Sequence, residues 1–225
     1  MSIDSSVKRI MKPEQPAWLT SLQNDLALIT AQEAEKIWPH PETQAPYFNY
    51  RLEHVQQVER DALRILAEVK GDQEILLAAI WVHDRFQTQM ENEIHAHQAA
   101  AWTRENLAGL GFPEQKVDAV VYAAERHCDA PGKIPAGAVE ARILWDADRL
   151  TRIGPLSIIN YMLGHAAFPE MRISYNNIAL LGLEKLERSR RLVDEFYYQP
   201  SRQLAMSRFQ QQKAFFEAFA QDVQA

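Results

Sequence analysis

One unbroken run of eight apolar residues, Ile75 to Val82, ends directly in His83 and Asp84. A helix that is apolar on every side belongs in the interior of a fold. The run therefore predicts a central helix over 72–84 with a polar pair at its buried end. An ionised carboxylate is rarely buried without a positive partner, because its desolvation is costly. We expect a cation or several hydrogen-bond donors to face Asp84.

The rest of the chain favours an all-α fold. Only 8 glycines and 11 prolines occur in 225 residues, too few for a turn-rich all-β chain, and the glycines fall between long helical periods. The hydrophobic fraction of 47% is enough for a substantial core, and the length favours one domain over 1–225. We predict a core over about 49–165, on which an N-terminal helix (18–38) and C-terminal helices (within 176–220) pack. Within that core, the predicted helices cover 49–71, 72–84, 93–110, 114–127, 138–153 and 155–163.

Composition excludes several classes of protein. The formal charge of −6, from 24 Lys+Arg against 30 Asp+Glu, argues against extended nucleic-acid binding. The longest apolar run has eight residues where a membrane span needs about 20, so no membrane association is expected. The single cysteine, Cys128, excludes an intramolecular disulfide and a zinc site built on cysteines. We expect a cytoplasmic protein, whose oligomeric state the sequence does not indicate.

Two further residues are candidates to complete a metal site with His83 and Asp84. His54 lies among the apolar positions of its predicted helix, and Asp146 has Ile143 three residues before it and Leu150 four after it. Imidazole and carboxylate groups are normal ligands of a divalent transition metal. The alternatives are a core histidine without a ligand role, and an aspartate that neutralises a neighbouring arginine.

Asp148 competes with Asp146 for this role. Residues two apart point about 200° away from each other on a helix, so only one of the two carboxylates is expected to face the site. We assign Asp146 to the site and expect Asp148 to orient Arg149 or Arg152.

The order His54, His83-Asp84, Asp146 resembles the H…HD…D signature of the HD-domain metal-dependent phosphohydrolase superfamily. The segments NYRLEHVQQVERDALRILAE, LLAAIWVHD and ILWDADRLTRIG are similar to those of its small single-domain bacterial members, and the resemblance extends over about 49–219. Two segments differ from that branch: HDRFQTQMENE lacks the usual acidic residue and lysine after the HD pair, and Thr151-Arg152 replaces Asp-Ala.

The resemblance implies a compact helical bundle with a metal site in its centre, and hydrolysis of a nucleotide or another small phosphoester by a phosphatase or phosphodiesterase. The implied cofactor is a divalent transition metal (Mn, Fe, Co, Ni or Zn), with Mg as a further option, and the implied ligands are His54, His83, Asp84 and Asp146. Asp84 is also expected to orient or deprotonate the attacking water.

Other residues are assigned to the substrate. Arg85 is the first candidate to bind phosphate because it adjoins the HD pair, ahead of Arg126, Arg149 and Arg152. His127 is expected near the pocket as a proton donor to the phosphate or the leaving oxygen.

Two functional alternatives stay open. A dinuclear iron oxygenase on the same fold would need His97 and His127 as additional ligands, and a regulatory protein would bind a nucleotide without turnover. Nucleophilic catalysis by Cys128 is not favoured, because no spacing signature accompanies its neighbour His127.

Overall fold

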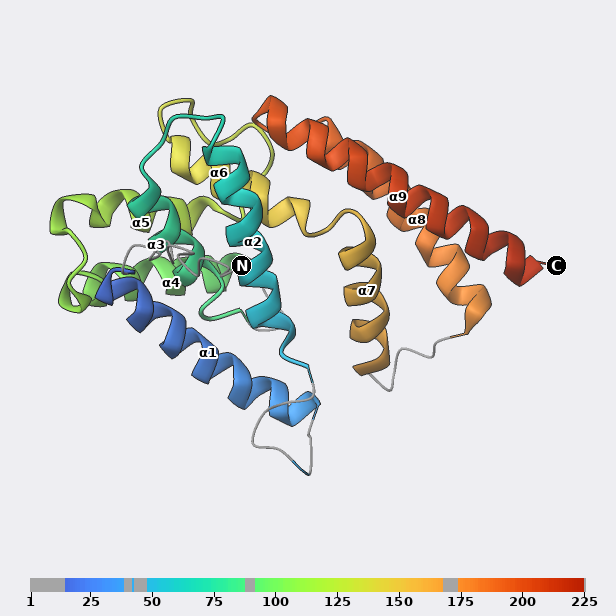
Figure 1. Cartoon of the computed structure of the whole chain (residues 1–225), viewed down its shortest axis with the longest axis horizontal. Coiled ribbons are helices and arrows are strands. Elements are labelled where there is room, and N and C mark those ends of the chain that lie inside the picture. Colours follow the sequence, from blue (N-terminus) through green and yellow to red (C-terminus); the bar gives the residue numbers. More distant parts are fainter. Residues whose placement is uncertain (1–14, 39–41, 43–47, 88–91, 168–173, 225) are drawn as a thin grey trace, which may run out of the picture.

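The computed structural model describes residues 15–38, 42, 48–87, 92–167 and 174–224, and within these ranges it contains helices and no strands. The all-α prediction is confirmed. None of the helices in the described ranges is long and apolar enough to cross a bilayer. The elements, shown in Figure 1, are α1 (Ala17–Ile37), α2 (Tyr50–Leu66), α3 (Gln73–His83), α4 (Asn92–Asn106), η1 (Ala108–Leu110), η2 (Glu114–Lys116), α5 (Val117–Arg126), α6 (Val139–Leu150), α7 (Pro155–Ala167), α8 (Tyr175–Val193) and α9 (Gln199–Gln224).

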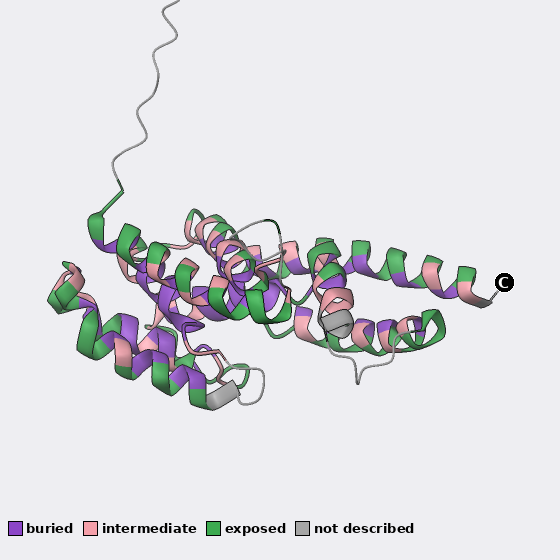
Figure 2. Cartoon of the chain, turned by 90° about the horizontal axis from the view of Figure 1, so that it is seen from below, coloured by how far each residue is buried: buried purple, intermediate pink, exposed green. Residues whose placement is uncertain are grey.

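The central helix is α3, as the apolar run predicts. Asp72 caps its N-terminus by accepting from the backbone N–H groups of Glu74 and Ile75. Every residue from Leu76 to His83 is buried, because α1, α2, α4, α5 and α6 all pack against this helix. Figure 2 shows the corresponding buried centre, with exposed faces on the outer helices. The polar pair at the end of α3 therefore lies in the interior.

Helix α6 is the second buried element, and it packs on α2, α3 and α5. Its residues from Ile143 to Leu150 are all buried, charged side chains included. The helix ends before Gly154, whose φ of 96° is accessible mainly to glycine. When a helix is buried on all sides, its apolar periodicity does not show which side faces the centre. The periodicity of α6 therefore does not assign a direction to its acidic residues.

The C-terminal helices form a hairpin that extends from the body (Figure 1). Helices α8 and α9 pack along each other, and α9 also contacts α6 and α7. Arg208 on α9 makes two 2.7 Å hydrogen bonds to the buried carboxylate of Asp61 on α2. This bidentate pair fixes the hairpin to the helix that carries His54.

Observed helix ends lie within five residues of the predicted ones. The helix predicted over 49–71 ends at Leu66. The helix predicted over 155–163 continues to Ala167. Residues 168–173, which follow it, lie outside the described ranges.

Gly182 tests the packing of the hairpin. A Cβ at this position would lie 2.2 Å from a ring carbon of the fully buried Phe216. We expect Gly182→Ala to lower the free energy of unfolding by about 1–3 kcal/mol through overpacking. Gly109→Ala is the matched control, since a Cβ there meets nothing within 4 Å. Equal denaturant midpoints for the two variants would contradict this packing.

Candidate metal centre

His83 and Asp84 lie at the C-terminal end of α3, and both side chains are almost completely buried. The Nδ1–H of His83 donates to the carbonyl of Ile80 at 2.6 Å. A carbonyl can only accept, so this bond fixes the tautomer and leaves the Nε2 lone pair of neutral His83 facing the centre. Nε2 of His83 lies 3.5 Å from Oδ2 of Asp84.

His54 on α2 faces the same carboxylate. Its Nε2 lies 3.1 Å from Oδ2 of Asp84 and 3.2 Å from Oδ1 of Asp148 on α6. Three helices thus bring two imidazoles and two carboxylates together. The structure brings His54, His83 and Asp84 together, where the sequence predicts a shared site.

The placement of Asp146 is a correction. Its two carboxylate oxygens accept from the backbone N–H groups of Tyr197 and Tyr198, at 2.9 and 3.1 Å, at the junction of α8 and α9. Asp148, two residues along α6, faces His54 in its place, and it also contacts Arg152 at 3.1 Å. Only one of the two aspartates faces the site, as helix geometry predicts. That residue is Asp148, not Asp146 as predicted from the sequence.

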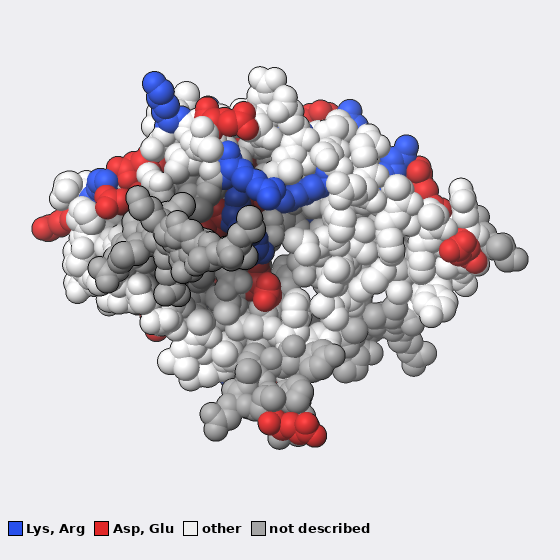
Figure 3. All heavy atoms as spheres, in the orientation of Figure 1, with Lys and Arg blue, Asp and Glu red and all other residues white. Residues whose placement is uncertain are grey.

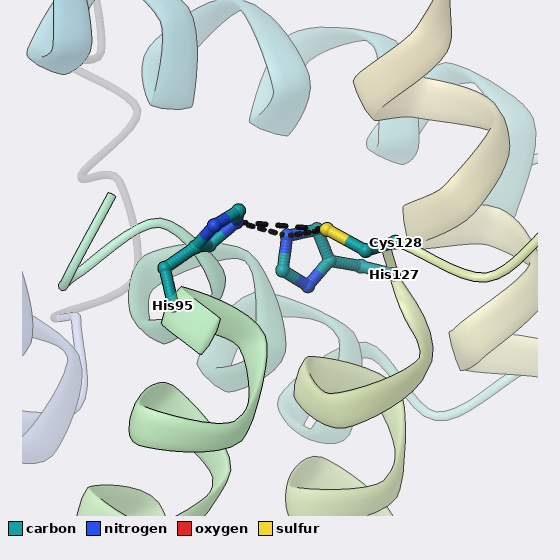
Figure 4. Close-up of side chains that lie close together, drawn as sticks. All are labelled: His95, His127 and Cys128. Atoms are coloured by element: carbon teal, nitrogen blue, oxygen red, sulfur yellow. Dashed lines mark hydrogen bonds between the residues drawn. The ribbon is translucent and has the colours of Figure 1, made fainter. Parts of the chain in front are cut away.

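Two more histidines face Asp84 from the opposite side. The Nε2 atoms of His95 on α4 and of His127 after α5 lie 3.5 and 3.6 Å from Oδ1 of Asp84. His97 does not: its side chain is 68% exposed and lies 3.3 Å from Glu125. Figure 4 shows His95 from α4 opposite His127 from the end of α5. The structure places His127 near the centre, and the second histidine that faces Asp84 is His95, not His97.

The charges of this cluster shift several pKa values. Burial lowers the pKa of His54, but the carboxylates of Asp148 and Asp84 outweigh it and hold that pKa at about 9. Burial lowers the pKa of His83 to about 4. Burial raises the pKa of Asp84, but His83 and the other imidazoles hold it well below its usual range. The carboxylates of Asp84 and Asp148 therefore stay ionised and favour positive charge beside them, either protons on the imidazoles or a cation.

The donor set fits a divalent ion. Within the described residues, Nε2 of His54 and Nε2 of His83 are buried without a hydrogen bond of good geometry, although carboxylate oxygens lie 3.1 to 3.5 Å away. Buried polar atoms without such a partner are rare and need an explanation. Imidazole nitrogens and carboxylate oxygens that share one point are ligands suited to Mn, Fe, Co, Ni or Zn.

Arg85 is engaged elsewhere. Its guanidinium pairs with Asp25 on α1 at 2.6 Å and stacks 3.9 Å above the ring of Trp102 on α4. It therefore ties α1 and α4 to the end of α3, and the expected phosphate-binding role is not supported by these contacts. Arg149 is also committed, since it stacks 3.8 Å from Trp145 and donates to the carbonyl of His127 at 2.7 Å.

Two basic side chains of another helix lie near Arg152, the arginine that contacts Asp148. Arg152 follows α6, and Lys185 and Arg188 lie on α8. Burial lowers the pKa of the half-buried Lys185 to about 8, and the positive charges of Arg188 and Arg152 add to this. In Figure 3 a band of basic side chains crosses the middle of one face and borders a hollow with acidic atoms below it. The sequence does not single out Lys185, because no motif or spacing relates its helix α8 to His83 and Asp84.

Comparisons with known proteins point to one fold. No protein-family model matches the sequence, and no curated protein matches it significantly. Among solved structures, YpgQ from Bacillus subtilis in complex with ADP superposes with a TM-score of 0.63 at 17% identity, over 91% of this chain and 96% of that one. A predicted HD-superfamily hydrolase from an uncultured Thermotogales bacterium gives 0.56 at 20% identity, over 91% and 92%. An HD-superfamily hydrolase from Bacillus thuringiensis gives 0.58 at 17% identity, over 90% and 99%.

The two aspartates of α6 provide a matched pair for testing the ligand set. We expect Asp148→Ala to lower metal occupancy, because it removes a carboxylate that faces His54. We expect Asp146→Asn to keep the metal and to lower the free energy of unfolding by about 1–3 kcal/mol through loss of a buried acceptor. Metal analysis and denaturant unfolding of both variants check this, and metal loss confined to the Asp146 variant would reverse the assignment.

Proposed function

We propose that this chain, which has the fold of the HD-superfamily hydrolases, is a metal-dependent phosphohydrolase that acts on a nucleotide or another small phosphoester. The observation that carries the proposal is the convergence of His54, His83, Asp84 and Asp148 on one buried point. His54, His83 and Asp84 each offer a ligand atom to one group that could hold a metal ion. Oδ1 of Asp148 lies 3.2 Å from Nε2 of His54.

His54, His83, Asp84 and Asp148 would hold the ion in this proposal. A divalent metal bound there would lower the pKa of a coordinated water and neutralise charge on a phosphoryl oxygen. Two imidazoles among the four ligands favour Mn, Fe, Co, Ni or Zn, with Mg as a further option.

The protein's own side chains prepare the site. The carbonyl of Ile80 holds His83 in the tautomer that presents Nε2. Asp84 places one carboxylate oxygen toward His54 and His83 and the other toward His127, so it is positioned to orient a water between them. His127 is 2% exposed and lies within reach of that water as a proton donor or acceptor.

The basic side chains at the mouth support an anionic substrate. Arg152 lies 3.1 Å from Asp148 and is 58% exposed, so its guanidinium can reach both the site and solvent. Lys185 is half-buried next to two arginines, which is unfavourable unless an anion joins them. Guanidinium and ammonium groups both bind phosphate.

The nucleotide part of the proposal has two supports. Tyr50, 43% exposed, stacks on the ring of His54 with 6.2 Å between centroids, which leaves aromatic surface at the mouth for a base. The similar structure of YpgQ was determined with ADP.

The deciding experiment is metal analysis of the purified protein, followed by assay of the metal-loaded protein on phosphomonoesters, phosphodiesters and nucleotides. Release of phosphate or a nucleoside phosphate, abolished in Asp148→Ala, would support the hydrolase. Nucleotide binding without turnover in every metal form would indicate a regulatory protein. Oxygen consumption by an iron-loaded form would indicate an oxygenase.

Lys185 tests the role of the basic side chains. We expect Lys185→Ala to raise KM for a phosphorylated substrate about tenfold, because hydrogen bonds to charged groups contribute about 1.5–3 kcal/mol. Metal content should not change. Lys213→Ala on α9 is the control, since that lysine is half-exposed and pairs with Glu217 at 3.5 Å. Identical KM values in the two variants would exclude Lys185 from substrate binding.

A further inference from the structure

Arg208 on α9 connects α2 with the end of α6 and the start of α7. Its guanidinium donates to both carboxylate oxygens of Asp61 on α2, at 2.7 Å each, and to the carbonyl of Leu150 at the end of α6, at 3.1 Å. The aliphatic part of its side chain lies against Gly154, where an added Cβ would be 2.9 Å from Cβ of Arg208. One side chain thus holds the junction of α6 and α7 against α2.

The pair of Arg208 with Asp61 is buried and specific in direction. Asp61 is fully buried, and its carboxylate also accepts from Nε2 of Gln57 at 3.0 Å. Bidentate pairing of a guanidinium with a carboxylate fixes orientation as well as distance. Asp61 therefore holds the Arg208 guanidinium in the orientation from which it reaches the carbonyl of Leu150.

The turn over 151–154 lies between the two points that Arg208 contacts. It begins after Leu150, whose carbonyl accepts from the guanidinium. It ends at Gly154, whose φ of 96° is accessible mainly to glycine and whose missing side chain lets Arg208 approach. Arg152 lies in this turn. Arg208 thus fixes both ends of the segment that carries Arg152.

Arg152 depends on this backbone for its position. Its guanidinium lies 3.1 Å from the carboxylate of Asp148, and its side chain is 58% exposed. Within the described part of the chain, the hydrogen bond to Asp148 is the one that its guanidinium makes. A long, exposed side chain held at one point follows its backbone, so a shift of the turn moves the guanidinium away from Asp148.

We propose that Arg208, held by Asp61, is a positioning residue that keeps Arg152 beside Asp148 for binding of a phosphorylated substrate. Arg208 does not face the substrate itself, because its side chain is 15% exposed and its guanidinium is engaged by Asp61 and Leu150. The role of Arg152 in this proposal rests on the proposed function, whereas fixation of the turn by Arg208 does not.

A double-mutant cycle tests whether Arg208 acts through Arg152. We expect Arg208→Lys to raise KM about tenfold, since lysine cannot make the bidentate pair and also reach Leu150. Arg152→Ala should raise KM by about the same factor, and the double variant should raise it no further. Metal content should not change. Effects on KM that multiply would show that Arg208 does not act through Arg152 and would overturn the proposal.

Two further variants separate positioning from stability. Arg190→Lys on α8 is the control, because its pair with Asp194 is exposed, and its KM should equal that of the unchanged protein. The double variant Asp61→Leu/Arg208→Met leaves no unpaired charge in the interior, so we expect it to fold and to show the same rise in KM. Lower denaturant midpoints with unchanged KM in both Arg208 variants would make Arg208 purely structural.

Hydrogen exchange gives a measurement that does not depend on turnover. The backbone N–H groups of 151–153 donate to the carbonyls of 148–150 at 3.0 to 3.2 Å. In Arg208→Lys we expect them to exchange about tenfold faster, while those of 143–147 in α6 do not change. Faster exchange of the turn without hydrolysis of any phosphoester would keep its fixation by Arg208 and end the proposed function. Hydrolysis with unchanged exchange and KM in this variant would do the reverse.

Discussion

The buried carboxylate of Asp84 is the constraint on which the centre of this protein depends. Only 3% of Asp84 is exposed, and its oxygens lie within 3.6 Å of four imidazole nitrogens from α2, α3, α4 and the end of α5. An isolated carboxylate in such a place would cost several kcal/mol, so these helices must supply donors or hold a cation. The apolar run of α3 places the carboxylate of Asp84 in the interior. The side chains that surround this carboxylate therefore have to be polar.

The parts of the fold that follow from local chemistry could be predicted from the sequence. The apolar run predicted the position of α3, and the glycines between helical periods indicated the all-α class. The choice between Asp146 and Asp148 could not be predicted in the same way. Both are buried, because α6 is covered on every side, so flanking apolar residues do not tell which carboxylate points to α2. Only the three-dimensional position of the α8–α9 junction decides it.

The same reason explains the error between His95 and His97. Two residues apart on α4, they face different directions, and the sequence around both is rich in alanine. Contacts with distant elements assign them: His95 meets His127, 32 residues later, and His97 meets Glu125. Arg85 was misjudged for a related reason. Its nearness to the HD pair in sequence suggested phosphate binding, but Asp25 and Trp102 on other helices hold its guanidinium.

The position of Asp146 gives α6 a second function in the fold. While Asp148 faces His54, Asp146 binds the backbone at Tyr197 and Tyr198, so one helix connects the metal centre to the α8–α9 junction. Burial raises the pKa of Asp146 to about 6, although the two backbone donors and Ser201 act against this rise. The pair between Arg208 and Asp61 joins α9 to α2 as well. Helix α8, which carries Lys185, is therefore tied through α9 to both helices that bear His54 and Asp148. A basic side chain that is remote in sequence can in this way keep a fixed position near Arg152, the arginine that contacts Asp148, as recognition of a phosphorylated substrate requires.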